Sequence, residues 1–407
     1  MKNKTKVVFV LIDALRSDYI TKEDSPFLYS FSIKNKYYKN VTQSRSFCER
    51  AEIFSGLSPR ESGYFTAMGY SPEKSPFRNI SILDKLSFID KIFGKYRYYK
   101  ALKNRIIRLL FINKKVAMRS YSIPLNFLKY FSLTEDEYDF REEIAFNGKE
   151  NIFKDCINNG LNIYYDSFTA LNFTNSNTDE ERLQMVENNI DSKHDLYLTY
   201  VGVMDSCAHV YGPDSIERKS ELKKLDQRLF NFHKNIISKH KDAKFIFLGD
   251  HGMASVKHSV DLGQALNQEA KLCKLKAGKD FIYFLDSTMF RIWYLNENAS
   301  KILNNKLKSN PIFINNGVFV NKIIAKKEKI PFPDKRYGDL LWMANTGVLV
   351  FPDFFHTTNP YKGMHGYDIN HFSSKGTCIV SANEFDYCES IKLTDVYQII
   401  KKELNID

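Results

Sequence analysis

The stretch KVVFVLID, residues 6–13, decides the fold class of this chain. Its run VVFVLI is continuously apolar and rich in β-branched residues, which is typical of a strand buried on both faces of a parallel sheet. The run ends in Asp13, at the carboxyl end of the predicted strand. Because ligands gather at that edge in open α/β sheets, Asp13 is the first candidate site residue.

Two later apolar runs repeat this pattern. LYLTYVGVM, residues 196–204, runs into Asp205, and KFIFLG, residues 244–249, runs into Asp250. A single aspartate at the end of a strand is usually part of a turn or a helix cap. Three buried strands that each end in aspartate instead predict an α/β fold with a functional site at the strand ends.

Further elements are expected around these three strands. Short strands are predicted at residues 162–166, 280–285, 290–294 and 347–351, with Asp286-Ser287-Thr288 as the hairpin turn between the second and third. Helices are predicted at residues 178–189 and 394–404, the second with Thr394 as its cap.

The chain has 407 residues, which is too long for one simple core. We therefore expect a catalytic core in three parts with two insertions between them. The core is assigned to residues 1–75, 181–260 and 336–407, the first insertion to residues 76–180 as a basic, mainly helical cap, and the second insertion to residues 261–335.

Composition indicates an ordinary soluble globular protein, with 43% hydrophobic and 26% charged residues. The six cysteines show no CxxC spacing and do not form a disulfide-dense pattern. No secretory leader and no apolar run of membrane-spanning length is visible. We expect a cytoplasmic protein, with peripheral contact at a membrane surface left open.

The net charge of +11 is concentrated in one segment. Residues 91–119 hold ten lysines and arginines and no acidic residue, with apolar side chains interleaved. Such a segment is typical of contact with an anionic membrane surface or a polyanion. The alternative is a helical cap that packs its apolar side on the core. No nucleic-acid reading motif accompanies the charge, so nucleic acid is not the expected partner.

Histidines accompany the strand-end aspartates. His209 follows Asp205 by four residues, so the two side chains converge if the segment is helical. His251 directly follows Asp250, and His365 lies in the later stretch GMHGYD. With Asp13 these residues supply two sites of mixed carboxylate and imidazole ligands, which suit zinc, with manganese as a substitute. Two such ions about 4 Å apart form the usual clamp for displacement at phosphorus.

Five motifs occur in a familiar order: VVFVLIDALRSDYI, SFCERAEIFSGLSPRESG, DSCAHVYGP, GDHGM and MHGYD. Together they resemble the alkaline phosphatase superfamily, in its type I phosphodiesterase/nucleotide pyrophosphatase branch. The resemblance implies an alkaline-phosphatase-like three-layer sandwich with a largely parallel central sheet and inserted cap segments. It also implies a metal-dependent hydrolase of phosphodiester or pyrophosphate bonds that acts on a small phosphodiester or nucleotide-type substrate.

The resemblance assigns the site residues. The family's nucleophile lies ten residues before the glycine of its Thr/Ser-Gly-Leu motif, which is Ser46 relative to Gly56. Catalysis would pass through a phosphoserine at Ser46, activated at a centre of two zinc ions. One zinc would be held by Asp13, Ser46, Asp250 and His251, and the other by Asp205, His209 and His365.

The residues after Ser46 depart from the family pattern. Phosphodiesterases of this branch usually continue with Phe-Pro-Asn, whereas here Phe47-Cys48-Glu49 follows. A carboxylate at Glu49 repels phosphate unless it is paired or protonated. Arg50 suits phosphate oxygens and resembles the arginine that sulfatases place four residues after their nucleophile.

We therefore predict Glu49, Arg50 and Tyr211 as substrate-binding residues, and Arg50 also as catalytic. The alternative for Glu49 and Arg50 is a local ion pair on the helix after Ser46. Two other functions are also considered. One is a phosphoryl-group transferase or phosphomonoesterase acting on a glycan- or lipid-linked substrate. The other is a metal-binding module without catalysis.

Overall fold

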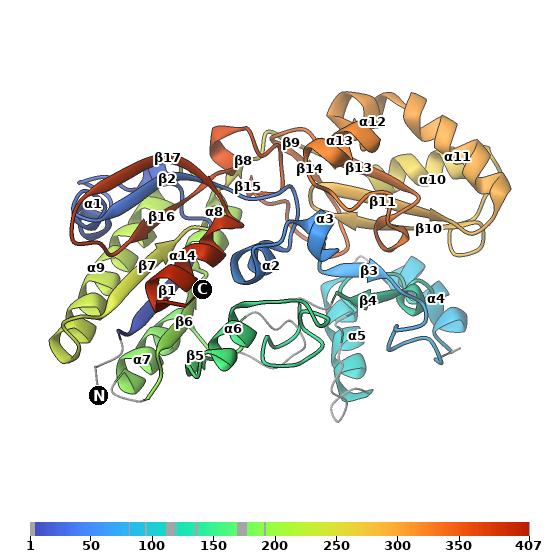
Figure 1. The fold of residues 1–407 in the computed structure, drawn as a ribbon. Helices are drawn as coiled ribbons and strands as arrows, with labels where there is room; N and C mark the ends of the chain where they lie inside the picture. Colours follow the sequence, from blue (N-terminus) through green and yellow to red (C-terminus); the bar gives the residue numbers. More distant parts are fainter. Residues whose placement is uncertain are drawn as a thin grey trace.

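The computed structural model describes residues 5–80, 82–93, 96–110, 118, 120–134, 137–168, 177–190 and 193–406 (Figure 1). Part of the basic segment at residues 91–119 therefore lies outside the described residues, including Lys95, Lys114, Lys115 and Arg119.

A seven-stranded sheet forms the centre of the molecule, in the order β17-β2-β16-β7-β1-β6-β5. Its strands are β1 (Val7–Ile12), β2 (Lys36–Thr42), β5 (Ile163–Tyr165), β6 (Leu196–Val201), β7 (Lys244–Leu248), β16 (Gly376–Val380) and β17 (Asp386–Lys392). Strands β5, β6, β1 and β7 are mutually parallel, and β16 pairs antiparallel with both β7 and β2. The prediction of a largely parallel sheet is confirmed.

The three strands predicted from the apolar runs occupy neighbouring positions in this sheet. The first and third end where expected, but the second ends earlier, at Val201, because helix α8 (Val203–Tyr211) begins there. The carboxylate of Asp179 accepts hydrogen bonds from the backbone N–H groups of Gly202 and Val203. An acidic side chain at a helix N-terminus stabilises the helix, so the chain turns from strand to helix at this point.

Helices cover both faces of the sheet, as the alternating side chains of β1 show. Val8, Val10 and Ile12 belong to one core with α1 (Pro26–Ser32), α7 (Asp179–Asn189) and α9 (Ile216–Lys239). Val7, Phe9 and Leu11 belong to the core on the other face, with α2 (Glu49–Ser55), α6 (Ile152–Asn158) and α14 (Asp395–Leu404). The predicted three-layer α/β sandwich is therefore confirmed (Figure 1).

A second, antiparallel sheet carries most of the later insertion. Its strands β10 (Phe281–Asp286), β11 (Met289–Tyr294), β13 (Leu340–Ala344) and β12 (Gly317–Phe319) pair in that order. Helices α10 (Leu262–Leu272), α11 (Glu297–Ser309), α12 (Pro311–Asn316) and α13 (Lys322–Lys327) belong to the same part of the chain. The expected hairpin is present, with β10 reaching Asp286 so that Ser287 and Thr288 alone form the turn.

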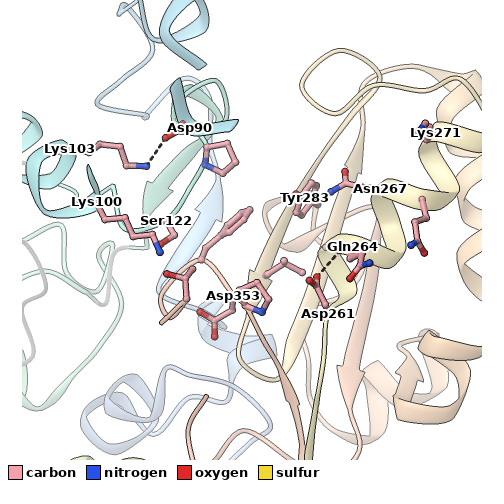
Figure 2. A pocket seen from close by; sticks show the side chains of 17 residues that line it. Asp90, Lys100, Lys103, Ser122, Asp261, Gln264, Asn267, Lys271, Tyr283 and Asp353 are labelled. Atoms are coloured by element: carbon pink, nitrogen blue, oxygen red, sulfur yellow. Dashed lines mark hydrogen bonds and ion pairs between the residues drawn. The ribbon is translucent and has the colours of Figure 1, made fainter. Parts of the chain in front are cut away.

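The basic cap contains helices α4 (Ile82–Phe93) and α5 (Arg97–Leu110). Ile107 is buried, whereas Tyr98 and Leu109 are 90% and 61% exposed. No described helix combines the length and apolar character needed to cross a bilayer. A cavity of about 600 Å³ separates α4 and α5 from α10 and β10 (Figure 2).

The remaining elements are short. They are β3 (Met68–Tyr70), β4 (Phe131–Leu133), β8 (Ala254–Ser255), β9 (His258–Val260), β14 (Val348–Val350), β15 (Gly363–Met364), α3 (Pro59–Ser62), and the 3₁₀ turns at Ser17–Tyr19, Leu128–Tyr130, Lys335–Tyr337 and Phe372–Ser374. The expected strand at residues 162–166 is β5, which lies within the predicted cap, residues 76–180, yet forms one edge of the central sheet.

Candidate metal centre and active site

The candidate ligands meet beyond the carboxyl ends of three parallel strands. Asp13 follows β1, Asp250 and His251 follow β7, and Asp205 and His209 lie on α8 after β6. Two groups form, in each of which the ligand atoms lie within 4.8 Å of one another. One group is Asp13, Asp250 and His251, and the other is Asp205, His209 and His365. These are the two sets predicted from the sequence, apart from Ser46.

Hydrogen bonds from neighbouring groups orient His251 and Asp13 in the first group. Nδ1 of His251 lies 2.9 Å from the carbonyl oxygen of Gly252, which only accepts, so Nδ1 carries the proton. In the neutral ring the lone pair of Nε2 then faces Asp13, whose Oδ1 is 3.0 Å away. Tyr200 donates its hydroxyl hydrogen to the other oxygen of Asp13, Oδ2, at 2.5 Å.

The second group repeats this arrangement. Nδ1 of His209 lies 2.8 Å from the carbonyl oxygen of Gly363, and its Nε2 lies 3.1 Å from Oδ1 of Asp205. Nε2 of His365 is 3.9 Å from the same carboxylate oxygen. The ring of Tyr361 stacks on the His209 ring with centroids 4.5 Å apart, so the imidazole is fixed by packing as well.

This donor set fits a metal ion. Oδ1 of Asp13 and Oδ1 of Asp205 are buried, and each lies 3.0 to 3.1 Å from the Nε2 atom of a histidine, so either a proton on that nitrogen or a cation must lie between the two atoms. Two facing lone pairs repel unless a proton or a cation lies between them. Carboxylate oxygens and imidazole nitrogens whose other nitrogen binds a backbone carbonyl are the usual ligands of zinc, and they also suit manganese.

Burial and charge shift the acidities of these groups in opposite directions. Burial, reinforced by His251 and His209, holds the pKa of His365 well below its ordinary value, so its ring stays neutral and able to bind a cation. Burial also raises the pKa of Asp250 to about 7, against the opposing charge of His251. Burial disfavours the charged form of His251, but Asp250 and Asp13 outweigh it and raise the pKa of His251.

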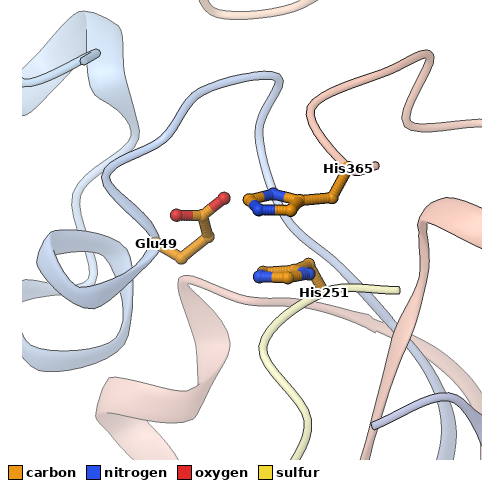
Figure 3. A group of neighbouring side chains, drawn as sticks. All are labelled: Glu49, His251 and His365. Atoms are coloured by element: carbon orange, nitrogen blue, oxygen red, sulfur yellow. The ribbon is translucent and has the colours of Figure 1, made fainter. Parts of the chain in front are cut away.

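Glu49 lies with two of the histidines (Figure 3). One carboxylate oxygen of Glu49 lies within 4.8 Å of a ring nitrogen of His251 and of a ring nitrogen of His365, and these two nitrogens are equally close to each other. The two imidazole rings stack with their centroids 4.0 Å apart. Oε1 of Glu49 is buried and makes no hydrogen bond within the described chain. Burial raises the pKa of Glu49 to about 8, although His251 opposes the shift. Glu49, predicted to bind substrate, thus belongs to a third group of candidate metal ligands.

The side chain of Arg50 pairs with Glu137 rather than with the group formed by Glu49 and the two histidines. Its Nη2 atom donates to both carboxylate oxygens of the fully buried Glu137, at 3.1 and 3.3 Å. Successive side chains on a helix diverge, so Glu49 faces the histidines while its neighbour Arg50 pairs with Glu137. The local Glu49–Arg50 ion pair is therefore not the arrangement found. The pKa of Asp13 is lowered because His251, Tyr200 and the charge of Arg50 together outweigh the effect of burial.

Ser46 lies just before α2 and is 1% exposed. Its Oγ accepts a hydrogen bond from the backbone N–H of Cys48 at 3.4 Å. The ring of its neighbour Phe47 packs edge-on against His365, with centroids 5.4 Å apart. Gly56 ends α2 in the left-handed conformation, at φ 69°, which confirms the expected helix stop. The loop that carries Ser46, the predicted nucleophile, is thus held beside the candidate metal ligand His365.

A cavity of about 430 Å³ opens onto the second group. Its lining includes Phe47, Asp205, His209, His365, Ser287, Phe355, His356 and Tyr361. The residues of α8 that line it are Asp205, Ser206, His209 and Val210, while Tyr211, predicted to bind substrate, is 47% exposed at the end of the helix.

Sequence reasoning missed Tyr200 and Tyr361. The run before Asp205 is apolar apart from the hydroxyl groups of Tyr197, Thr199 and Tyr200, and these groups are the signal that could have drawn attention to Tyr200. Tyr361 has no such signal, because it lies 152 residues beyond the histidine that it stacks on.

Known proteins resemble this chain in sequence and in fold. The model of the family described as type I phosphodiesterase/nucleotide pyrophosphatase matches residues 7–368. No functionally curated protein matches the chain.

Similar solved structures include ectonucleotide pyrophosphatase/phosphodiesterase 5 from mouse, as an inactive variant in complex with AMP, and the same protein from human. The TM-score is 0.68 in both cases, with 15% and 16% sequence identity, and the match covers 99% of this chain and 96% of each of those. At this identity the likeness shows the shared fold.

Proposed function

From the premise that this chain belongs to the type I phosphodiesterase/nucleotide pyrophosphatase family and is a hydrolase of that kind, we propose that it cleaves a nucleotide-type phosphodiester or pyrophosphate with Ser46 as nucleophile. The mouse protein of similar fold was solved with AMP, which supports a nucleotide-type substrate here. Two zinc ions, with manganese as the substitute, are the proposed cofactors.

The proposed ligands are the two groups of side chains at the strand ends. Asp13, Asp250 and His251 would hold one ion, with Ser46 completing its set. Asp205, His209 and His365 would hold the other. Bound ions of this kind supply positive charge that lowers the pKa of a hydroxyl group and stabilises a leaving oxygen.

The proposed reaction proceeds by two displacements. Ser46 Oγ forms a bond to phosphorus while the bond from phosphorus to the leaving oxygen breaks, and the serine proton passes to that oxygen, which gives a phosphoserine. Water then attacks the same phosphorus, the bond to Ser46 Oγ breaks, and one proton of the water returns to the serine oxygen. Two inversions give net retention at phosphorus. In both steps the charge of Arg50, whose Nη2 atom is held by Glu137 and whose charge also lowers the pKa of Asp13, would attract the phosphate oxygens.

One observation supports this proposal more than any other. Both His209 and His251 have Nδ1 bound to a backbone carbonyl, and both direct Nε2 at an aspartate oxygen within 3.1 Å. Two preorganised imidazole–carboxylate pairs beside a buried serine loop are what a two-metal phosphoryl-transfer site requires.

The test is turnover of bis(p-nitrophenyl) phosphate by the zinc-reconstituted protein. We expect Ser46→Ala to abolish turnover while zinc binding at the second group persists. Ser44→Ala is the matched control, since its hydroxyl lies in the same loop and donates to Glu52 instead. Unchanged turnover in Ser46→Ala would refute the proposed nucleophile. A parallel assay with p-nitrophenyl phosphate distinguishes diesterase from monoesterase activity.

We also propose that the basic cap contacts an anionic membrane surface and that the protein is cytoplasmic. Ile92, Leu102, Ile106 and Leu109 on α4 and α5 are each at least half exposed and lie within residues 91–119, which hold no acidic residue. None of the six cysteines, all of which are described, forms a disulfide, which supports a reducing compartment. Co-sedimentation with phosphatidylserine vesicles tests the contact. Replacing Leu102 and Leu109 by glutamate should abolish it, and binding that survives this change would refute it.

A further inference from the structure

A second cavity of about 600 Å³ lies between the two insertions (Figure 2). Helices α4 and α5 form one side, and α10 and β10 form the other. Its volume falls within the range of small-molecule sites, about 300 to 1,000 Å³. The metal-ligand groups lie outside it, so this cavity is distinct from the candidate active site.

The side chain of Lys100 is part of the lining of this cavity. Nζ of Lys100 on α5 is inaccessible to solvent and has no hydrogen-bond partner among the described residues. Burying a charge without a partner is costly, and an anion in the cavity would remove that cost. Lys103, one turn along the same helix, adds a second buried ammonium that lies 3.0 Å from the carbonyl oxygen of Ile123.

The carboxylates of the lining already have donors. Asp90 accepts from Tyr99, Lys103 and the backbone N–H of Leu125. Asp353 accepts from the Ser287 hydroxyl at 2.6 Å and from two backbone N–H groups. Asp261, the third carboxylate of the lining, accepts from the backbone N–H of Gln264 at 2.7 Å. Among the described residues, none of the three forms an ion pair with Lys100, whereas Asp90 lies 3.4 Å from the ammonium group of Lys103.

The opposite side of the cavity offers neutral polar groups. Gln264, Asn267 and Gln268 are exposed along α10, and all three line the cavity beside Tyr283. Amide groups both donate and accept, which matches the hydroxyl groups of a polyol, and an aromatic ring packs against the apolar face of a sugar.

A shared wall connects the cavity to the candidate active site. Asp353 and Phe354 line the cavity between the insertions, whereas the next residues, Phe355 and His356, line the cavity beside the metal ligands. The Ser287 hydroxyl, which lines the cavity beside the metal ligands, donates a hydrogen bond to Asp353, which lines the cavity between the insertions.

We propose that the cavity between α5 and α10 binds a sugar or similar polyol that carries one phosphate or carboxylate group. Lys100 and Lys103 hold the anionic group, and the amide groups of α10 hold the hydroxyl groups. The ligand is either the distal half of the substrate or a free sugar phosphate. The idea that the ligand is part of the substrate rests on the proposed function, whereas binding of a free sugar phosphate does not depend on it.

Binding is tested by calorimetry with glucose 6-phosphate on the full-length, metal-loaded chain carrying Ser46→Ala, so that no turnover occurs. We expect saturable binding that Lys100→Gln weakens by about tenfold or more, since a hydrogen bond between charged groups is lost. Arg105→Gln removes the same charge from the exposed face of the same helix and should leave the affinity unchanged. Asn267→Ala should weaken binding of glucose 6-phosphate more than binding of inorganic phosphate.

Three results would overturn the proposal. The first is the absence of saturable binding. The second is an equal loss of affinity in Lys100→Gln and Arg105→Gln. The third is loss of binding in His365→Ala while Lys100→Gln still binds, which would place the ligand at the candidate active site. Circular dichroism and thermal unfolding of each variant exclude misfolding as the cause.

Kinetics with the active enzyme separate the two sources of the ligand. If the site holds the distal half of the substrate, Lys100→Gln raises KM about tenfold for a p-nitrophenyl phosphodiester formed at O1 of glucose 6-phosphate, whose 6-phosphate stays free to reach Lys100. The same change leaves KM for bis(p-nitrophenyl) phosphate unchanged. If the site holds a free sugar phosphate, both KM values stay unchanged while glucose 6-phosphate binding is lost.

Discussion

Nδ1 of His209 lies 2.8 Å from the carbonyl oxygen of Gly363, a hydrogen bond that joins α8 to β15. It fixes the proton on Nδ1 and turns Nε2 toward Asp205. Gly363 itself lies close to α8, since a Cβ atom there would come within 2.4 Å of the carbonyl oxygen of Ala208. Backbone contacts, rather than side-chain packing alone, therefore orient this candidate ligand.

Tyr200→Phe should weaken zinc binding by about ten- to a hundredfold, because Asp13 loses the hydroxyl group that orients its carboxylate. Competition with a chelator of known affinity measures the change. Tyr197→Phe is the control, since it lies on the same strand and its hydroxyl donates to carbonyl oxygens near the end of α7. Equal affinities in Tyr200→Phe and wild type would contradict a supporting role for this hydroxyl.

Glu49→Gln should lower the affinity for zinc about tenfold, because it removes a carboxylate from the group shared with His251 and His365. The measurement is zinc stoichiometry and affinity by the same competition method. Glu52→Gln removes another buried carboxylate from the same helix, outside the three ligand groups, and should retain zinc. If Glu49→Gln keeps its zinc affinity and instead lowers KM for the diester, Glu49 acts on the substrate.

Arg50→Lys should lower kcat/KM for bis(p-nitrophenyl) phosphate by about tenfold while zinc binding stays intact. Lysine keeps the charge but loses the planar fork, which here bridges toward Glu137 at 3.1 Å. Arg60→Lys, on the exposed surface of α3, is the matched control. An unchanged kcat/KM in Arg50→Lys would exclude a guanidinium-specific role in catalysis.

Stability should fall with rising pH through Glu52. Burial raises the pKa of Glu52 to about 7, against two hydrogen bonds from Ser44, whereas the ordinary value is 4.5. The native state therefore binds this proton more tightly than the unfolded state, and the unfolding free energy decreases between about pH 4.5 and pH 7. The contribution is about 3 kcal/mol over that range.

Urea unfolding of wild type and Glu52→Gln at pH 5 and pH 8 measures this contribution. The variant cannot ionise at this position, so its stability should depend less on pH than that of wild type. Parallel pH profiles for the two proteins would show that Glu52 is not the group responsible.

Gly249→Ala should destabilise the protein by about 3 kcal/mol, because its Cβ would come within 2.1 Å of the carbonyl oxygen of Leu15. The strain falls next to Asp250 and should also weaken zinc binding. Gly148→Ala meets no described atom within 4 Å and should cost only about 1 kcal/mol through its positive φ. Thermal unfolding compares the two, and equal losses would contradict the close-approach argument.

Much of the fold could be predicted from the sequence because its signals are local. An apolar, β-branched run specifies a buried strand wherever it occurs, and the aspartates that end three such runs specify one edge of the sheet. The spacing of Asp205 and His209 likewise implies one helical face, and α8 provides it. For these elements the pattern of residues within a short stretch is enough to predict the secondary structure and the face on which the side chains lie.

Tertiary structure alone decided which groups meet. Arg50 pairs with Glu137, 87 residues away, and Glu49 lies with His251 and His365 rather than with its neighbour. The cavity between α5 and α10 forms from two insertions that show no common signal in the sequence. Hydrogen bonds and ion pairs act over about 3 Å in defined directions, so they depend on how distant segments pack, which local residue patterns do not encode.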